Sequence, residues 1–307
     1  MKILITGATG FVGRALWPIL LEAGHSLVVL ARDASRARAS IPAATVHEWN
    51  GVIGLPPAEA FEGVEAIINL IGESVAQRWN PERKRRFRDS RVLATRALVE
   101  RLGTLTERPR ILISMAGVGI YGDRKDEVLT EKSVAGTGFL ATLGKEWEAA
   151  ASSARDLGLR VVILRSGAVL GEGGGIMGKL LPVFRLGLGG KFGSGEQHLP
   201  WIHLVDLTRL IVHSLTASDL DGPVNAVAPE PVTNAEFVRA LAKTLHRPCA
   251  MTVPAVALRL TMGEMAEEVL LSSQNVSPVR ALESQFEFRF SLLNAALANL
   301  VGEPHSA

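Results

Sequence analysis

Cysteine and tyrosine are almost absent from this chain. Its 307 residues include one cysteine, Cys249, and one tyrosine, Tyr121. A single cysteine cannot form an intramolecular disulfide, so a disulfide-stabilised scaffold is excluded and we expect a protein of the reducing cytoplasm. Because tyrosine occurs once, any mechanism that needs a tyrosine hydroxyl must use Tyr121.

Long hydrophobic runs and a strong excess of charge are also missing. The longest apolar stretches are broken by Gly, Arg or Pro, and the chain opens Met1-Lys2-Ile3-Leu4 without the features of a signal peptide, so we expect neither a membrane span nor a leader. A net charge of +2 and 5% aromatic residues argue against a nucleic-acid-binding surface. No His/Cys cluster has ligand spacing, so no metal is expected.

The remaining composition, 47% apolar and 21% charged, is that of an ordinary globular protein. Short apolar runs alternate with helical patterns, which predicts a parallel sheet covered by helices. The predicted strands are Lys2 to Thr6, Ser26 to Ala31, Thr45-Val46, Ala66 to Leu70, Arg110 to Ser114 and Arg160 to Arg165. The predicted helices are Ala15 to Ala23, one that starts at Asp33, Pro81 to Arg101, and Leu140 to Asp156.

The second part of the chain has a different composition. Glycine is dense in Gly171 to Gly178 and Gly187 to Gly195, and prolines punctuate shorter elements beyond them. We therefore expect a Rossmann-type doubly wound α/β fold, with residues 1–170 as the core and residues 171–307 completing it and forming a small substrate lobe. Gly302 to Ala307 is expected to be a frayed tail.

A glycine-rich turn, Gly7-Ala8-Thr9-Gly10-Phe11-Val12-Gly13, follows the first strand directly and opens a helix. In this context Gly7 permits a tight turn, Gly10 lets the backbone approach a pyrophosphate, and Gly13 allows close packing of helix on strand. The helix N-terminus supplies free N–H groups and a partial positive charge. The turn predicts dinucleotide binding and makes residues 1–170 the cofactor-binding core.

The end of the second strand indicates which dinucleotide is bound. It reads Leu30-Ala31-Arg32-Asp33, so a cation precedes the acidic residue. An arginine here pairs with the 2′-phosphate of NADP(H), whereas an acidic side chain accepts from the ribose hydroxyls of NAD(H). We predict NADP(H) held by Arg32, with Arg36 or Arg14 nearby. Asp33 keeps NAD(H) open, although an N-cap role suits its carboxylate.

Several further motifs carry a family resemblance. They are Asn69-Leu70-Ile71-Gly72-Glu73, Arg78-Trp79, Lys84, Ser90-Arg91, Trp201-Ile202-His203, Asp206, Gly222 to Pro229, and Phe286 to Phe290. With the glycine turn, they resemble an atypical epimerase-family group within the extended branch of the short-chain dehydrogenase/reductase superfamily. This group is NAD-dependent epimerase/dehydratase-like and carries a C-terminal domain of unknown function.

The resemblance implies a nicotinamide cofactor at the carboxyl ends of the strands, contacted by Leu70, Gly72 and Lys145 besides the glycine turn. It implies no particular substrate. Hydride transfer in the superfamily generally uses a Tyr as acid or base, a Lys four residues later, and a Ser that polarises the carbonyl.

The Tyr and Lys roles match this sequence only in part. Tyr121 and Lys125 form a literal Y-x-x-x-K, but Lys125 falls in a polar loop. Lys145 matches the family lysine by its helix, although Ala141 stands four residues before it. Tyr121 and Lys145 are therefore catalytic candidates in a degenerate site.

The other catalytic candidates are Ser114 and Glu73. Ser114 ends a strand, but the best registers place Ala116 or Gly117 at the active position. Glu73 follows the fourth strand, where ligands bind in open α/β sheets, and a solvated loop carboxylate is the alternative. Arg91 stands where an Asn is usual in the family.

Two groups of polar residues have both a structural and a functional interpretation. The helix from Glu82 to Arg91 carries six cations. They form a solvated face, or they line the cleft and bind an anionic substrate or phosphates, or they bind nucleic acid. His203 and Asp206 are expected to make structural hydrogen bonds. Paired helices often make dimers in related proteins, so a homodimer stays open.

The sequence thus supports two functions. The first is an NADP(H)-dependent oxidoreductase or epimerase-like enzyme that acts on a small carbonyl or hydroxyl compound. The second is a non-catalytic NADP(H)-binding sensor or interaction protein, favoured by the degenerate Ser-Tyr-Lys site. A Gly-x-Ser-x-Gly elbow does not occur, which removes the common hydrolase alternative.

Overall fold

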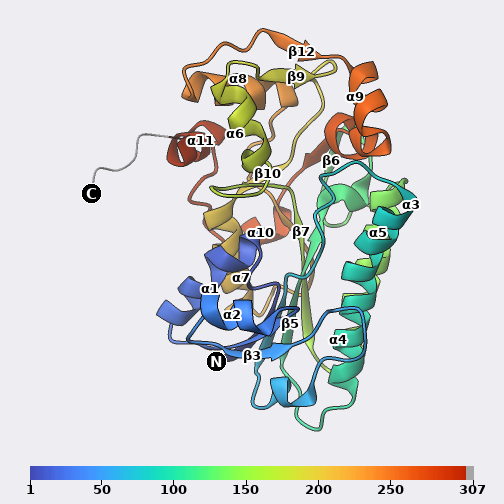
Figure 1. Cartoon of the computed structure of the whole chain (residues 1–307), viewed down its shortest axis with the longest axis vertical. Coiled ribbons are helices and arrows are strands. Elements are labelled where there is room, and N and C mark those ends of the chain that lie inside the picture. Colours follow the sequence, from blue (N-terminus) through green and yellow to red (C-terminus); the bar gives the residue numbers. More distant parts are fainter. Residues whose placement is uncertain (302–307) are drawn as a thin grey trace.

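The protein is built around a seven-stranded parallel sheet, seen in a computed structural model that describes residues 1–301 (Figure 1). The strand order is β11-β7-β5-β4-β1-β2-β3, so the chain moves outward from β1 to one edge and then crosses to the other. The strands are β1 (Lys2–Thr6), β2 (Ser26–Ala31), β3 (Thr45–Glu48), β4 (Ala66–Asn69), β5 (Ile111–Gly117), β7 (Arg160–Ser166) and β11 (Gly222–Ala226). The predicted doubly wound Rossmann-type fold is confirmed.

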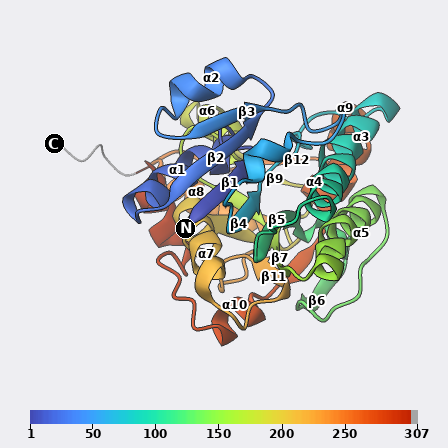
Figure 2. The same cartoon turned by 90° about the horizontal axis from the view of Figure 1, so that it is seen from below.

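Helices cover both faces of this sheet (Figure 2). One face carries α1 (Phe11–Glu22) and α7 (Leu204–Thr216), which pack against each other. The other carries α4 (Ala94–Gly103) and α5 (Phe139–Ser152). Near the edges and ends lie α2 (Ala34–Ser40), α3 (Pro81–Arg88) and α10 (Val279–Glu283).

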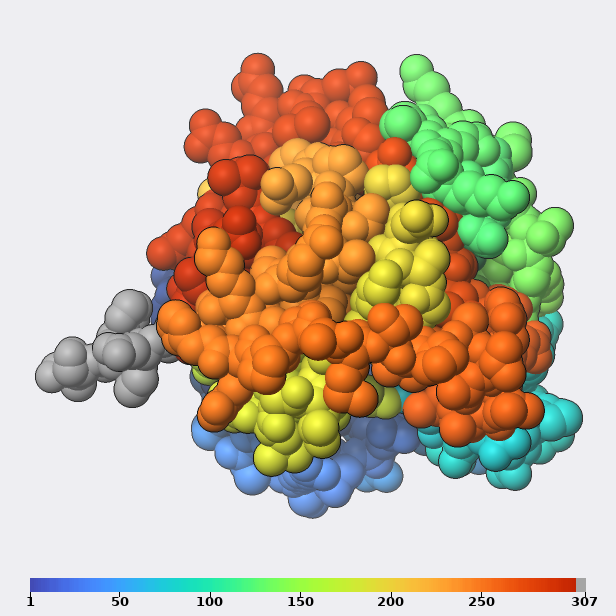
Figure 3. Space-filling model, turned by 90° about the horizontal axis from the view of Figure 1, so that it is seen from above, coloured from blue at the N-terminus to red at the C-terminus, as the bar shows by residue number. Residues whose placement is uncertain are grey.

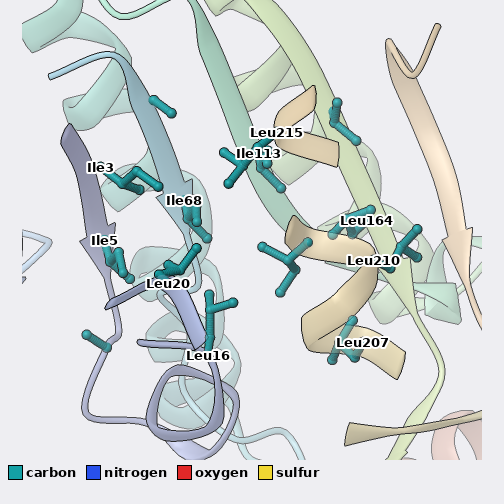
Figure 4. Close-up of a cluster of buried hydrophobic side chains, with 14 of the residues drawn as sticks. Ile3, Ile5, Leu16, Leu20, Ile68, Ile113, Leu164, Leu207, Leu210 and Leu215 are labelled. Atoms are coloured by element: carbon teal, nitrogen blue, oxygen red, sulfur yellow. The ribbon is translucent and has the colours of Figure 1, made fainter. Parts of the chain in front are cut away.

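Alternating strand residues fill the two layers between sheet and helices. Ile3, Ile5 and Ile68 point to the α1 and α7 side, in one apolar cluster with Leu16 of α1 and Leu210 of α7 (Figure 4). Leu4, Ile67 and Leu112 point to the α4 and α5 side. Because a buried parallel sheet is covered on both faces, its strands read as continuous apolar runs rather than as alternating ones.

Residues beyond 170 divide between the core and a lobe. α7 and β11 complete the sheet layer. The lobe contains α6 (Met177–Arg185), α8 (Asn234–Thr244), α9 (Ala255–Met262) and α11 (Leu293–Val301). Three further pairs of short parallel strands connect segments that are distant in the sequence. They are β8 (Ala168–Leu170) with β10 (Trp201–His203), β9 (Gly190–Phe192) with β12 (Met251–Val253), and β6 (Lys125–Leu129) with β13 (Gln274–Val276). The division after residue 170 stays a proposal.

The lobe covers the end of the molecule at which the parallel strands finish. Segments coloured yellow to orange form most of the surface in Figure 3, which looks at this end. The lobe has its own core, in which Phe184, Trp201, Phe237 and Leu297 are buried. Within residues 1–301 no helix is long and apolar enough to cross a membrane.

Several predicted boundaries shift in the structure. The first helix begins at Phe11 rather than Ala15, because the helix starts inside the glycine turn. The predicted helix from Pro81 to Arg101 contains a π-helical turn at Asp89–Leu93 between α3 and α4. Lys125 begins β6 instead of lying in a loop. The predicted tail from Gly302 lies outside the described residues.

Asp206 fastens the C-terminal segment to the core. Its carboxylate is fully buried and accepts hydrogen bonds from the backbone N–H groups of Arg289 and Phe290, each at 2.8 Å. The neighbouring His203 caps α7 by accepting from the N–H of Val205 at 3.2 Å, and burial lowers the His203 pKa. Both residues make the structural hydrogen bonds expected from the sequence.

We expect Asp206→Ala to lower the free energy of unfolding by about 2–4 kcal/mol, because two buried N–H groups lose their charged acceptor. Urea denaturation measures this, and limited proteolysis should reveal cutting near Phe286 to Phe290. Asp219→Ala, at an exposed site, is the matched control and should change stability little. Equal stabilities of the two variants would contradict the anchoring role.

Candidate functional site

A cleft crosses the carboxyl ends of the strands in two connected parts. We call the part near β2 the outer part, of about 720 Å³, and the part beneath the lobe the inner part, of about 510 Å³. The two parts share Gly7, Gly10, Leu70, Ile71 and Gly72, so they form one path across β1 and β4. Ligands bind at such a place in open α/β sheets, because the loops after adjacent strands diverge there.

The glycine turn forms the middle of this path. Gly7 has φ +70°, and the Gly10 N–H donates to the Gly7 carbonyl oxygen at 2.9 Å. A Cβ on Gly13 would lie 2.4 Å from the Gly7 oxygen, so no side chain fits at this contact. No side chain caps the N-terminus of α1, which leaves its first N–H groups directed at the cleft. This cradle fits a pyrophosphate.

The structure brings the predicted cofactor residues together, with the exception of Lys145. Gly7, Gly10, Leu70 and Gly72 line both parts of the cleft. The inner part also touches Phe11, Val12 and Gly13, and the outer part touches Thr9 and Arg32. These residues line one connected cleft, and their contact with a cofactor stays a prediction.

Cations gather in the outer part. Arg32 and Arg36 are exposed there, and Arg86 lines the same space. The Asp33 carboxylate accepts from the Arg36 N–H at 2.9 Å and so caps α2, which is the structural role considered for it. Arg14 lines neither part of the cleft, so of the two alternatives Arg36 has the better position, and the contact of either with a 2′-phosphate stays a prediction.

Lys145 does not face the cleft. Its side chain is exposed on α5, while Gly144 beside it lines the inner part. Each residue of an α-helix is rotated by about 100° from the next, so an offset of one residue exchanges the solvent face for the cleft face. Two i, i+4 pairs of α5 line the inner part, Leu140 with Gly144 and Leu143 with Trp147, and neither of them is a Tyr/Lys pair.

Ile120 fills the space that a longer side chain at Gly144 would need. A Cβ built on Gly144 would lie 2.9 Å from the Ile120 Cβ. The helix predicted from Leu140 to Asp156 forms as α5, but the sequence did not show which of its side chains meet the cleft. The 3₁₀ turn Val118–Tyr121 decides this, because it packs directly on α5.

Tyr121 is buried beneath the cleft rather than in its wall. Its hydroxyl donates to Asn225 Oδ1 at 2.7 Å and accepts from Arg165 Nη1 at 2.9 Å. Arg165 in turn donates twice to the Glu148 carboxylate, at 2.7 Å each. Burial raises the Tyr121 pKa, although Arg165 opposes this. In this geometry the only tyrosine holds the core together and does not reach the inner part.

Ser114 is buried in a second polar network. Asn69 Nδ2 donates to Ser114 Oγ at 3.2 Å and to Thr95 Oγ1 at 3.0 Å, and Thr6 donates to Asn69 Oδ1 at 2.7 Å. The network joins β1, β4, β5 and α4 below the floor of the cleft. Ala116, rather than Ser114, lines the inner part, as the best sequence registers indicated.

Glu73 lies at the rim of the outer part. Its carboxylate accepts from Arg86 Nε at 3.1 Å and from Gln77 Nε2 at 3.3 Å. It therefore offsets one of the cations there, and it does not line the inner part.

Most cations of α3 pair with carboxylates. Arg86 pairs with Glu73, and Arg88 Nε donates to Glu146 at 2.6 Å. Lys84 pairs with Glu264 of the lobe. These contacts favour the interpretation of this helix as a charged surface over that of an anion-binding face.

Arg91, which follows α3, lines the inner part. The π-helical turn that contains it also brings Asp89 and Ser90 to the outer part. Its guanidinium donates to the Glu73 carbonyl oxygen at 2.7 Å and lies 5.1 Å above the Trp147 ring. Burial lowers the Arg91 pKa to about 10, so the side chain remains a cation at neutral pH.

The lobe contributes residues that the sequence did not single out. Glu268 accepts from the N–H groups of Phe139 and Leu140, at 2.8 and 2.7 Å, and so caps α5 from a distant segment. Glu268 and His198 both line the inner part. No local sequence pattern predicts the roles of Glu268 and His198, because their contacts are with residues distant in the sequence. Within residues 1–301 no cluster of side chains is suited to a metal ion.

Comparisons with known proteins agree with this geometry. Residues 3–227 match the NAD dependent epimerase/dehydratase family, and residues 253–300 match a domain of unknown function, DUF1731. The chain belongs to the NAD dependent epimerase/dehydratase family. The resemblance noted in the sequence is thereby confirmed.

Relatives in this family cover nearly the whole chain. It is 38% identical over 306 residues to epimerase family protein Mb2239 of Mycobacterium bovis, with 98% of each chain covered. The crystal structure of human epimerase family protein SDR39U1 with NADPH has TM-score 0.87 and 33% identity, covering 99% of this chain and 100% of that one. A nucleoside-diphosphate sugar epimerase from Corynebacterium glutamicum has TM-score 0.80 and 33% identity, covering 98% of this chain and 58% of that one.

We expect Tyr121→Phe to lower the free energy of unfolding by about 1–3 kcal/mol, because Asn225 and Arg165 each lose a buried partner. Cofactor affinity should stay within about twofold, since the hydroxyl lies outside the cleft. Urea denaturation and calorimetric titration measure the two quantities. Thr142→Val removes an exposed hydroxyl on α5 and serves as the control. Unchanged stability with a loss of cofactor binding would contradict the structural role.

Proposed function

We propose that the cleft binds NADPH, with the adenosine in the outer part, the pyrophosphate at the glycine turn and the nicotinamide in the inner part. The observation that carries this is the uncapped N-terminus of α1, which opens onto the junction of the two parts. The first N–H groups of this helix and the lack of side chains at Gly7 and Gly10 suit a pyrophosphate. The NADPH in the crystal structure of human SDR39U1 supports the assignment.

Arg32 and Arg36 favour NADPH over NADH. Both lie in the outer part, where a 2′-phosphate would meet their guanidinium groups. Asp33, which would otherwise accept from ribose hydroxyls, is occupied with the cap of α2.

We expect Arg32→Ala to weaken NADPH binding by about ten- to a hundredfold, because a charge-assisted hydrogen bond to the phosphate is lost. NADH binding should change little. Calorimetric titration with both cofactors measures the difference, and Arg14→Ala, outside the cleft, is the matched control. Equal losses for NADPH and NADH would remove Arg32 from the 2′-phosphate site.

For the reaction, we propose a cytoplasmic oxidoreductase or epimerase-like enzyme acting on a small carbonyl or hydroxyl compound. NADPH supplies a hydride when it is bound. This chain supplies Arg91 as a fixed cation in the inner part, which His198 also lines. Gln197 and Gln274 hold the lobe segments around the substrate space. A site of this kind uses a proton donor other than tyrosine.

A non-catalytic NADPH-binding protein is the second candidate. Leu140 and Gly144 occupy cleft-facing positions of α5, and Tyr121 is sequestered in the core. A screen of ketones and aldehydes at saturating NADPH, followed by absorbance, separates the candidates. Turnover of any compound supports the enzyme, whereas tight NADPH binding without turnover across the screen supports the sensor.

A further inference from the structure

Arg91 places a positive charge in the wall of the inner part. It is the only Lys or Arg among the described residues that line this part. Gly72 and Trp147, which line the same wall, lie against its guanidinium. A Cβ built on Gly72 would lie 3.2 Å from Cζ and 3.4 Å from Nε, and Cζ lies 5.1 Å from the centre of the Trp147 ring. The charged end of the side chain, and not only its aliphatic part, therefore lies in this wall.

The hydrogen bonds of Arg91 leave part of its guanidinium free. Nη1 donates to the Phe87 carbonyl oxygen at 3.3 Å and Nη2 to the Glu73 carbonyl oxygen at 2.7 Å. A guanidinium has five N–H groups, so these two bonds do not satisfy it. Nε has no hydrogen-bond partner within residues 1–301, and it is not fully enclosed by protein either. Its N–H group is therefore unpaired and accessible.

Arg91 also differs from its neighbours in having no counter-ion. Three cations on the preceding helix, α3, each pair with a carboxylate, namely Lys84, Arg86 and Arg88. Within residues 1–301 Arg91 forms no ion pair, and the carboxylate of the nearby Glu73 accepts from Arg86 instead. Burial lowers the Arg91 pKa to about 10, so a partly desolvated cation remains without an anion beside it.

The one carboxylate in the same wall does not compensate this charge. Glu268 is the only Asp or Glu among the described residues that line the inner part. Its two oxygens accept from the N–H groups of Phe139 and Leu140 at the N-terminus of α5, where the helix dipole also stabilises a negative charge. The charge of Arg91 is thus available to an anion from outside the protein.

The rest of the wall is mostly apolar. α5 supplies Leu140 and Leu143, and the lobe supplies Leu180, Phe237 and Leu270. Such walls favour a ligand that buries hydrocarbon surface. A ligand that suits both features carries one anionic group on an apolar body.

We propose that the inner part binds an apolar carboxylic acid as substrate, with its carboxylate accepting hydrogen bonds from the Arg91 guanidinium. The inference rests on the proposed function, because NADPH is the cofactor that this substrate would meet. It makes Arg91 the residue that selects acids over neutral compounds. A phosphate group of the cofactor has similar chemistry, and the two anions are distinguished by measuring both ligands.

The probes are 2-naphthoate and 2-naphthamide, which share the same apolar rings and differ in charge. Each is titrated calorimetrically into protein saturated with NADP⁺. We expect naphthoate to bind at least about tenfold more tightly than naphthamide, because only the acid accepts charge-assisted hydrogen bonds. Equal affinities, or no binding of naphthoate, would overturn the inference without any variant.

A variant tests the role of Arg91. Arg91→Gln should weaken naphthoate binding by about ten- to a hundredfold and leave naphthamide binding within about twofold, because the charge is lost and the apolar walls remain. Arg96→Gln, at an exposed position on α4, is the matched control and should change neither affinity. Urea denaturation checks that both variants fold. If Arg91→Gln does not fold, the acid-to-amide preference of the parent protein decides the inference.

Titration of NADP⁺ and NADPH into the same proteins separates this inference from the proposed function. Failure of both cofactors to bind the parent protein overturns the proposed function, and the two naphthyl probes are then compared in the protein alone. If Arg91→Gln loses affinity for NADPH and the parent protein shows no preference for naphthoate, Arg91 binds a phosphate of the cofactor. That result overturns only the inference.

Discussion

The contact between α1 and the turn before it is the constraint on which the rest of the site depends. Gly13 lies so close to the carbonyl oxygen of Gly7 that a Cβ has no room, and this closeness aims the N-terminus of α1 across the ends of β1 and β4. The outer and inner parts of the cleft meet at this point. A larger residue at Gly13 would move the helix away from the strand, and the path for a dinucleotide would lose its floor.

Two buried networks of hydrogen bonds lie below the floor of the cleft. They contain a tyrosine and a serine, residue types that often take part in catalysis. Tyr121, Arg165 and Glu148 connect the turn after β5 with β7 and α5, while Ser114 belongs to the network around Asn69. Buried hydrogen-bonded groups are costly to leave unpaired, so these side chains are committed to the fold. The inner part consequently takes its polar groups from elsewhere, namely Arg91 on the π-helical turn and His198 and Glu268 in the lobe.

The lobe completes the site as well as covering it. Glu268 supplies acceptors for the N-terminus of α5, which Gly138 cannot cap with a side chain. The helix that faces the cleft is therefore held by a residue more than a hundred positions further along the chain. Core and lobe line one cavity together, and the two family models match residues 3–227 and 253–300.

The sequence by itself determined the parallel sheet, the glycine turn and the cations after β2, because each depends on periodicity or on residues adjacent in the chain. Only the tertiary structure decided the direction of Lys145, since a one-residue offset on α5 turns a side chain from the cleft to solvent, and packing of Ile120 on Gly144 fixes that offset. It also decided the burial of Tyr121 and the place of His198. Those positions depend on contacts between distant segments, such as Tyr121 with Asn225, which no local pattern encodes.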